Sequence, residues 1–189
     1  MIDHAFIEAL EGFKTVAYVP TDRREVPLGK SGATVGVGVD LGQWSEAQLL
    51  RRLGPDPIIA LLRPYLGLRG WDAVRALKTA PLTLSERQAR ALTKSIRRDL
   101  EEALVSMYDK AAKRLGGLRW AVLPGPCQTV VMSVAYQYGP MLVRETPNFW
   151  AQVTAGRWAD AHKNLLDFKD DYPTRRRKEA EHLAPVLVP

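Results

Sequence analysis

Three side chains near the N-terminus have types and spacing that suit the hydrolysis of a glycosidic bond. Glu11 ends an apolar-patterned opening segment, and Thr34 and Asp40 lie in the glycine-rich segment 32–40. Cutting such a bond with water requires a proton donor on one side and an activated water on the other. Two carboxyl groups and a hydroxyl can supply both functions, so we expect neither a metal ion nor a cofactor.

The position of Glu11 follows from a short helix expected over residues 3–13. Phe6, Ile7 and Leu10 fall on one helical face, Asp3 can cap the first turn, and Gly12 can end the helix. A carboxyl at the junction of this helix with the next segment loses part of its hydration, which favours the protonated form that a general acid needs. A solvated glutamate is the common alternative at a helix end.

The segment 16–40 is expected to form twisted hairpins with turns near residues 20–25 and 29–32. Val35, Val37 and Val39 alternate with glycines, which predicts a strand whose glycine face lets another backbone approach closely. Taken singly, Thr34 is a common strand residue and Asp40 is typical of a strand end or a turn. Because they occur together with Glu11 and the glycine strand, we interpret them as candidate catalytic residues.

From Ser45 onward the chain is expected to be almost entirely helical. The expected helices are 46–53, 57–66, 71–79, 85–115, 126–138, 147–154, 157–168 and 174–183. The sequence therefore predicts an α+β, mainly helical fold in one domain, 1–189. We expect a small β-containing lobe over about 14–44 and a larger helical lobe over about 45–189 that includes the N-terminal helix and can share a helix with the first lobe.

The composition of the chain limits the kinds of partner that the protein can have. The 189 residues carry a formal net charge of +6, which suits an anionic nucleic acid, membrane surface or cell-wall polymer. The single cysteine, Cys127, excludes an intrachain disulfide and is expected to be a buried structural thiol. Neither a secretory signal nor a membrane-spanning segment is evident. We therefore expect synthesis in the cytoplasm and delivery to any wall substrate by other proteins.

Several segments resemble the phage-type lysozyme family, the muramidases that cut peptidoglycan. The resemblance rests on Glu11–Phe13, Tyr18 within Ala-Tyr-Val-Pro, Thr34–Gly38, Val134–Gly139, Phe149 with Trp158–Ala161, and Arg175–Glu181. It covers both ends and much of the middle of the chain. It implies a lysozyme-like fold of two lobes and a peptidoglycan substrate.

One departure from the commonest phage pattern selects a branch of the family. That pattern has a catalytic aspartate nine residues after the glutamate, where this chain has Pro20. Thr34 follows Glu11 by 23 residues and Asp40 follows six residues later, a spacing that resembles the pesticin-like branch. The resemblance thus implies Glu11 as acid, Thr34 as the hydroxyl that positions water, and Asp40 as the second carboxylate. Asp22 remains the alternative carboxylate.

The resemblance also implies an arginine from the closing helix near the catalytic glutamate. Arg176 or Arg175 can take this role, and a solvated basic face is the alternative for both. Tyr18 and Gln137 are expected to line the sugar-binding groove. A packing aromatic and a helix-surface amide are equally good interpretations of these two residues.

The expected function is hydrolysis of the β-1,4 bond between N-acetylmuramic acid and N-acetylglucosamine, with inversion, by a monomer acting on peptidoglycan glycan strands. A non-catalytic wall-binding module and a chitinase-like or chitosanase-like glycosidase remain alternatives. A nucleic-acid-binding protein is disfavoured because the basic runs 94–98 and 175–178 accompany no nucleic-acid motif. A phage endolysin released by a holin, a bacteriocin domain and a secretion-system effector would share these features.

Overall fold

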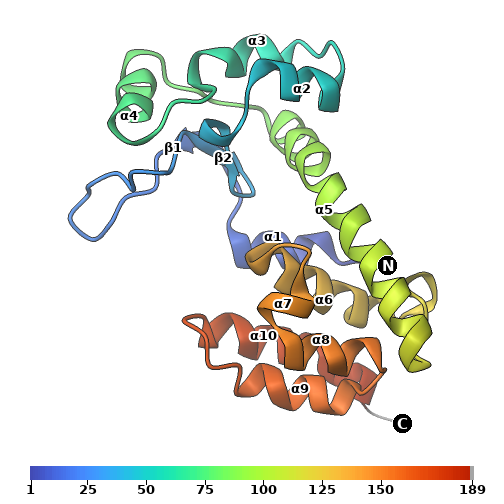
Figure 1. Ribbon diagram of the computed structural model, residues 1–189. Coiled ribbons are helices and arrows are strands. Elements are labelled where there is room, and N and C mark those ends of the chain that lie inside the picture. Colours follow the sequence, from blue (N-terminus) through green and yellow to red (C-terminus); the bar gives the residue numbers. More distant parts are fainter. Residues whose placement is uncertain (188–189) are drawn as a thin grey trace. The chain divides into compact units, whose positions relative to one another are not determined.

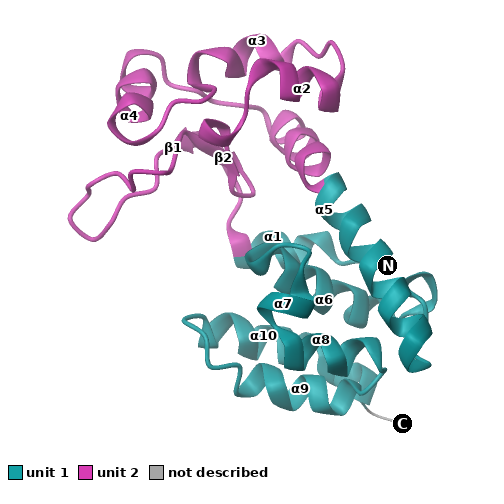
Figure 2. Cartoon of the chain, viewed as in Figure 1, with its two compact units in different colours: residues 1–10, 98–189 teal, residues 11–97 magenta. Residues whose placement is uncertain are grey.

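The computed structural model describes residues 1–187, which fold into two compact units (Figure 1, Figure 2). Unit 1 contains Met1–Leu10 and the chain from Arg98 onward, and unit 2 contains Glu11–Arg97. The long helix α5 (Glu86–Leu115) begins in unit 2 and ends in unit 1 (Figure 2). The fold is α+β and mainly helical, as predicted.

Unit 2 extends well beyond the β-containing lobe expected over 14–44. Its buried core joins residues of the sheet region to helices that follow it: Val35, Val39 and Leu41 share the core with Leu49, Ile59, Leu62 and Leu92. A sheet of three short strands buries too little apolar surface to be stable alone. The helices α2 (Glu46–Leu53), α3 (Ile58–Leu62) and α4 (Gly70–Thr79) therefore belong to the same unit.

The helices lie close to their expected bounds. Ser45 and Gln48 form the expected capping box of α2. The remaining helices are α1 (His4–Glu11), α6 (Gly125–Tyr138), α7 (Leu142–Glu145), α8 (Pro147–Thr154), α9 (Trp158–Leu166) and α10 (Pro173–Leu183). The segment 57–66 differs: α3 gives way to a 3-10 turn over Arg63–Tyr65, because Pro64 has no N–H for an α-helical hydrogen bond.

The sheet has the antiparallel order β1 (Lys14–Tyr18), β2 (Thr34–Gly36) and β3 (Val39–Asp40). Between β1 and β2 the chain forms a loop that projects from the rest of unit 2 (Figure 1). An isolated bridge between Thr21 and Pro27 closes this loop, and the Asp22 Oδ1 atom accepts the N–H groups of Arg24 and Val26 at 2.8 and 3.0 Å. Asp22 therefore shapes the tip of the loop.

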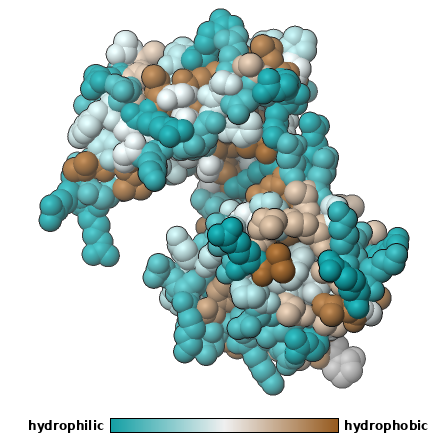
Figure 3. Space-filling model, viewed as in Figure 1, coloured by the Kyte–Doolittle hydropathy of each residue, from teal (hydrophilic) through white to brown (hydrophobic). Residues whose placement is uncertain are grey.

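Unit 1 is built on α6, whose residues from Cys127 to Ala135 are all buried. Cys127 is a buried free thiol, as predicted, and burial raises its pKa to about 12. The visible surface of each unit is largely hydrophilic, with scattered apolar residues (Figure 3). No helix within residues 1–187 is both long enough and apolar enough to span a bilayer.

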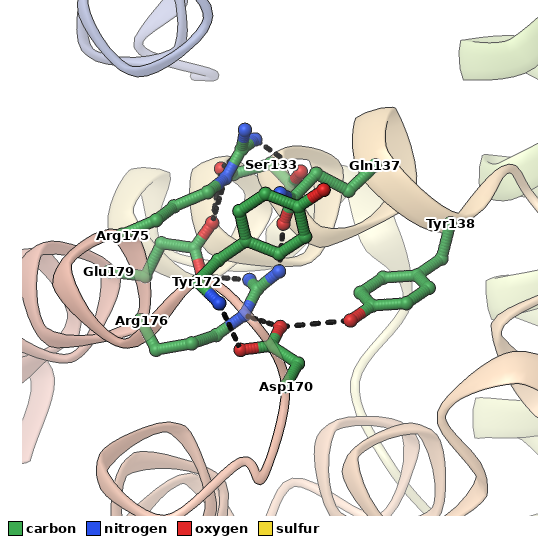
Figure 4. A network of polar contacts seen from close by, with 8 residues as sticks. All are labelled: Ser133, Gln137, Tyr138, Asp170, Tyr172, Arg175, Arg176 and Glu179. Carbon is green, nitrogen blue, oxygen red and sulfur yellow. Dashed lines mark hydrogen bonds and ion pairs between the residues drawn. The ribbon is translucent and has the colours of Figure 1, made fainter. Parts of the chain in front are cut away.

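An ion-pair network fixes α10 against α6 inside unit 1 (Figure 4). Glu179 is 0% exposed and pairs with Arg176, which is 1% exposed. Ser133 of α6 donates to the Glu179 Oε1 atom, and Arg175 donates to the same atom at 3.1 Å. Arg176 also donates to Asp170 at 2.8 Å. A buried charge is tolerated only with such partners, so α10 depends on Glu179.

We predict that Glu179→Gln lowers the free energy of unfolding by about 3–5 kcal/mol, because it leaves the buried Arg176 guanidinium short of a counter-charge. Urea unfolding followed by circular dichroism measures the change. Glu181→Gln is the matched control, since Glu181 lies exposed on the same helix and should change stability by less than about 0.5 kcal/mol. Equal effects of the two variants contradict this account of the network.

Candidate active site

Glu11 is the last residue of α1, and the chain turns there into the sheet. The Asp3 Oδ1 atom accepts the Phe6 N–H at 2.9 Å, so Asp3 caps the helix as predicted. Gly12 has φ of +77°, a conformation that glycine adopts without strain, and it ends the helix as predicted. The Glu11 side chain is half-buried. Glu11 is thus a half-buried carboxyl at a helix-to-strand junction, and its role as general acid stays a prediction.

The strand register brings Tyr18, Thr34 and Asp40 into one row. Tyr18 of β1 is the partner of Thr34 of β2, and Thr34 is the partner of Asp40 of β3. Side chains of directly paired residues lie on the same face of a sheet, with Cβ atoms about 4.5–5.5 Å apart. Three of the six expected site residues are therefore neighbours within unit 2.

Backbone N–H groups hold one oxygen of Asp40 firmly. The Oδ1 atom accepts the Gly32 N–H at 2.9 Å and the Gly42 N–H at 2.8 Å, while Gln43 Nε2 lies 3.3 Å from the Oδ2 atom. The Gly42 contact also caps the 3-10 turn over Leu41–Gln43. We call Asp40, Gly32 and Gly42 the carboxylate cradle. It leaves Oδ2 as the oxygen that can accept a proton.

The cradle requires glycine at two positions because other backbone atoms approach closely. A Cβ atom on Gly32 would lie 2.5 Å from the carbonyl oxygen of Leu68 and 2.6 Å from the Gly42 Cα atom. A Cβ atom on Gly42 would lie 2.5 Å from the same carbonyl oxygen and 3.0 Å from Asp40 Oδ1. This close backbone approach lies at Gly32 and Gly42, which flank the strands, whereas we expected it at Gly36 and Gly38 within the glycine strand.

Thr34 is 5% exposed, and its hydroxyl has a defined direction. The Oγ1 atom donates to the carbonyl oxygen of Gly32 at 3.2 Å. A hydroxyl has one hydrogen and two lone pairs, and this bond uses the hydrogen. The Thr34 hydroxyl can therefore only accept a hydrogen bond from a molecule that lies next to Asp40. The pair can accept both hydrogens of one water molecule.

The turn between β2 and β3 is fixed to α5 within unit 2. The Thr93 Oγ1 atom accepts the Val37 N–H at 3.2 Å, and Arg97 Nη2 donates to the Val37 carbonyl oxygen at 2.6 Å. Thr93 would be 2.4 Å from a Cβ atom on Gly36, which accounts for that glycine. Sequence reasoning missed both α5 residues, because they lie more than 50 positions away from the turn.

Tyr18 and Asp22 differ in what surrounds them. Tyr18 is 37% exposed, and Lys14 Nζ lies 4.0 Å from the centroid of its ring, so the ring is held at the surface in a place where a sugar could stack. Asp22 lies outside the strand pairs and uses Oδ1 to close the projecting loop. The pairing with Thr34 favours Asp40 over Asp22 as the second carboxylate.

Gln137 and Arg176 lie in unit 1 and contact each other, with Arg176 donating to the amide oxygen of Gln137 (Figure 4). Arg176 is 1% exposed and also pairs with Asp170 and Glu179, so its side chain packs inside unit 1. Arg175 instead lines a hollow of about 310 Å³ together with Ala9 and Leu10, at the end of α1. The choice between Arg175 and Arg176 as the arginine near the catalytic glutamate stays a prediction.

The ion-pair network around Arg176 changes the pKa values of Asp170 and Tyr138. Burial raises the pKa of Asp170, but hydrogen bonds from Arg176, Tyr138 and the Tyr172 N–H outweigh it, and the net pKa lies below its ordinary value. Burial, followed by the hydrogen bond to Asp170, raises the pKa of Tyr138. These shifts belong to a structural ion pair.

Within residues 1–187 no group of three or more His, Cys, Asp or Glu side chains is placed to hold a metal ion.

Comparison with known families identifies one family for the chain. Residues 1–159 match the family described as "Pesticin: Bacterial toxin homologue of phage lysozyme, C-term". The match includes Glu11, Tyr18, Thr34, Asp40 and Gln137 and ends before α10. No curated protein matches the chain. A lysozyme-like family supports an enzyme of the glycosidase type.

We predict that Gly32→Ala lowers the free energy of unfolding by about 1–3 kcal/mol, because the new methyl group forces the Leu68 carbonyl away from the cradle. Thermal or urea unfolding measures the loss. Gly29→Ala is the matched control, because no atom lies within 4 Å of a Cβ built there. A Gly32→Ala variant as stable as the Gly29→Ala variant would show that the cradle tolerates a side chain.

Proposed function

The chain belongs to the pesticin family of phage-lysozyme homologues, and we propose on this premise that it is a muramidase. It hydrolyses the β-1,4 bond between N-acetylmuramic acid and N-acetylglucosamine in peptidoglycan. The observation that carries the proposal is the pairing of Thr34 with Asp40 in the sheet. Two backbone N–H groups hold the Oδ1 atom of Asp40. The wall substrate is reached after release or delivery by a holin, a carrier or a secretion machine.

Glu11 acts as the general acid. Its proton passes to the glycosidic oxygen as the bond from that oxygen to the anomeric carbon of N-acetylmuramic acid breaks. A water molecule attacks the same carbon from the opposite ring face and gives its proton to Asp40 Oδ2. The proton count balances, because Glu11 ends ionised and Asp40 ends protonated. This inverting course needs carboxyl groups about 6.5–9.5 Å apart, whereas about 5–5.5 Å would suit a covalent intermediate.

The direction of the Thr34 hydroxyl supports its role in positioning water. Because the Thr34 hydrogen is used on the Gly32 carbonyl, a water between Thr34 and Asp40 must donate to both. The two hydrogens of the water then face the protein, and a lone pair faces away from it toward the sugar. Holding the nucleophile in this way raises the rate through orientation rather than through added charge.

Two other functions are the alternatives. A wall-binding module without activity would need no cradle for a carboxylate oxygen. A chitinase-like or chitosanase-like glycosidase would use the same acid and base on a polymer without muramic acid. The identity of the reducing end therefore separates the proposal from both alternatives.

We predict that Glu11→Gln and Asp40→Asn each lower kcat on peptidoglycan by about a hundredfold or more, since each removes one of the two proton-transfer groups. Thr34→Val should lower kcat by about tenfold, because one water contact is lost. Asp22→Asn is the matched control and should keep the wild-type kcat. The loss of turbidity of purified peptidoglycan gives the rates.

Mass spectrometry of the products and anomeric NMR complete this test. The expected products have reducing N-acetylmuramic acid ends in the α-configuration, the result of inversion at a β-linkage. Reducing glucosamine ends, anhydro-sugars or cut peptides overturn the assignment as a muramidase. An inactive Asp22→Asn beside an active Asp40→Asn would move the base to Asp22.

The net charge of the protein is confined to unit 2. Residues 11–97 contain 14 Lys and Arg against 8 Asp and Glu, whereas the rest of the chain contains 13 of each. Unit 2 therefore carries the whole +6 charge. The projecting loop of unit 2 presents Arg23, Arg24 and Lys30, all exposed. We propose that unit 2 attracts the carboxylates and phosphates of the wall.

We predict that the double variant Arg23→Gln, Arg24→Gln weakens binding to purified peptidoglycan about threefold to tenfold at low salt. The effect should disappear near 0.5 M salt, where the Debye length falls to about 4 Å. Lys110→Gln with Lys113→Gln removes the same charge from exposed positions of unit 1 and is the control. Sedimentation of the bound fraction gives the affinities, and equal losses in both double variants contradict a role specific to unit 2.

A further inference from the structure

The second oxygen of Asp40 is held by a side chain rather than by the backbone. Gln43 Nε2 lies 3.3 Å from Asp40 Oδ2 and donates to the carbonyl oxygen of Lys30 at 3.1 Å. Both acceptors face the NH₂ end of the amide. If the amide were turned around, its oxygen would face two acceptors and would repel the Asp40 carboxylate.

Arg69 determines which end of the Gln43 amide faces Asp40. Its Nη2 atom donates to Gln43 Oε1 at 3.1 Å, and its Nε atom donates to the Gly42 carbonyl oxygen at 3.1 Å. A guanidinium has donors and no acceptor, so it can bond only to the amide oxygen. With that oxygen fixed on Arg69, the NH₂ group must point toward Asp40.

Arg69 is itself held in place by its position in the chain. It is the residue before α4, and the next residue, Gly70, donates its N–H to the Ser31 carbonyl oxygen at 2.8 Å. Ser31 precedes Gly32 of the cradle. The segment that carries Arg69 is therefore tied to the same backbone that holds Asp40 Oδ1.

We infer that Gln43 is a positioning residue for the Asp40 carboxylate and that Arg69 acts on it through the orientation of the Gln43 amide. Together they prevent rotation of the carboxylate and keep Oδ2 directed to the water beside Thr34. The inference rests on the proposed role of Asp40 as the base. Because Gln43 and Arg69 are exposed, solvent competes with these hydrogen bonds, and the effect on rate is moderate.

The test compares Gln43→Met, Arg69→Met, Arg69→Lys and the double variant Gln43→Met, Arg69→Met on a soluble peptidoglycan glycan. We expect Gln43→Met and Arg69→Met each to lower kcat by about fivefold to tenfold, with KM within about twofold. The double variant should be no slower than Gln43→Met, since Arg69 acts through Gln43. Arg69→Lys should recover most of the rate, because an ammonium group is also only a donor.

Arg75→Met is the matched control, as Arg75 is an exposed arginine of α4 that pairs with Asp72. If Gln43 and Arg69 only stabilised the fold, their variants would have a lower free energy of unfolding in urea and an unchanged kcat. That result, or losses that multiply in the double variant, overturns the inference. Wild-type rates for Glu11→Gln and Asp40→Asn overturn the proposed function itself, whereas Arg69→Met at the wild-type kcat beside an inactive Asp40→Asn overturns only the positioning role.

Discussion

The close approach of the Gly32 and Gly42 backbones to Leu68 is the constraint on which unit 2 depends. It brings two N–H groups to one oxygen of Asp40 and places the 3-10 turn directly after β3. Two N–H donors on Oδ1 leave Oδ2 as the oxygen that would take up a proton in the proposed reaction. The position of the Asp40 carboxylate is thus set by main-chain packing more than by side-chain charge.

The surroundings of the two carboxyl groups differ in a way that suits different roles. Asp40 accepts backbone N–H groups inside a folded turn, whereas Glu11 lies half-buried where α1 ends. Enzymes commonly separate an acid from a base by giving two carboxyl groups unlike environments. The proposed division of roles between Glu11 and Asp40 would thus follow from local structure that is present without substrate.

Local signals predicted most of the fold and part of the site. The capping residues Ser45 and Asp3 and the helix-ending Gly12 act on neighbouring residues, so the sequence shows them directly. The sequence did not indicate the hydrogen bond between Gln43 and Arg69, because these residues lie 26 positions apart. The packing of Arg176 was missed for a related reason, since a basic run on an amphipathic helix does not show which arginine is turned inward.

The positions of the buried groups explain how so small a sheet can hold reactive groups steadily. Strands of three and two residues cannot fix Thr34 and Asp40 by their own hydrogen bonds. The apolar core that Val35 and Leu41 share with α2 and α3 supplies the missing rigidity, and Thr93 anchors the turn between the strands. Because a site must be held to within about half an ångström to be productive, the helices that carry no catalytic group are as necessary to the proposed reaction as the strands that do.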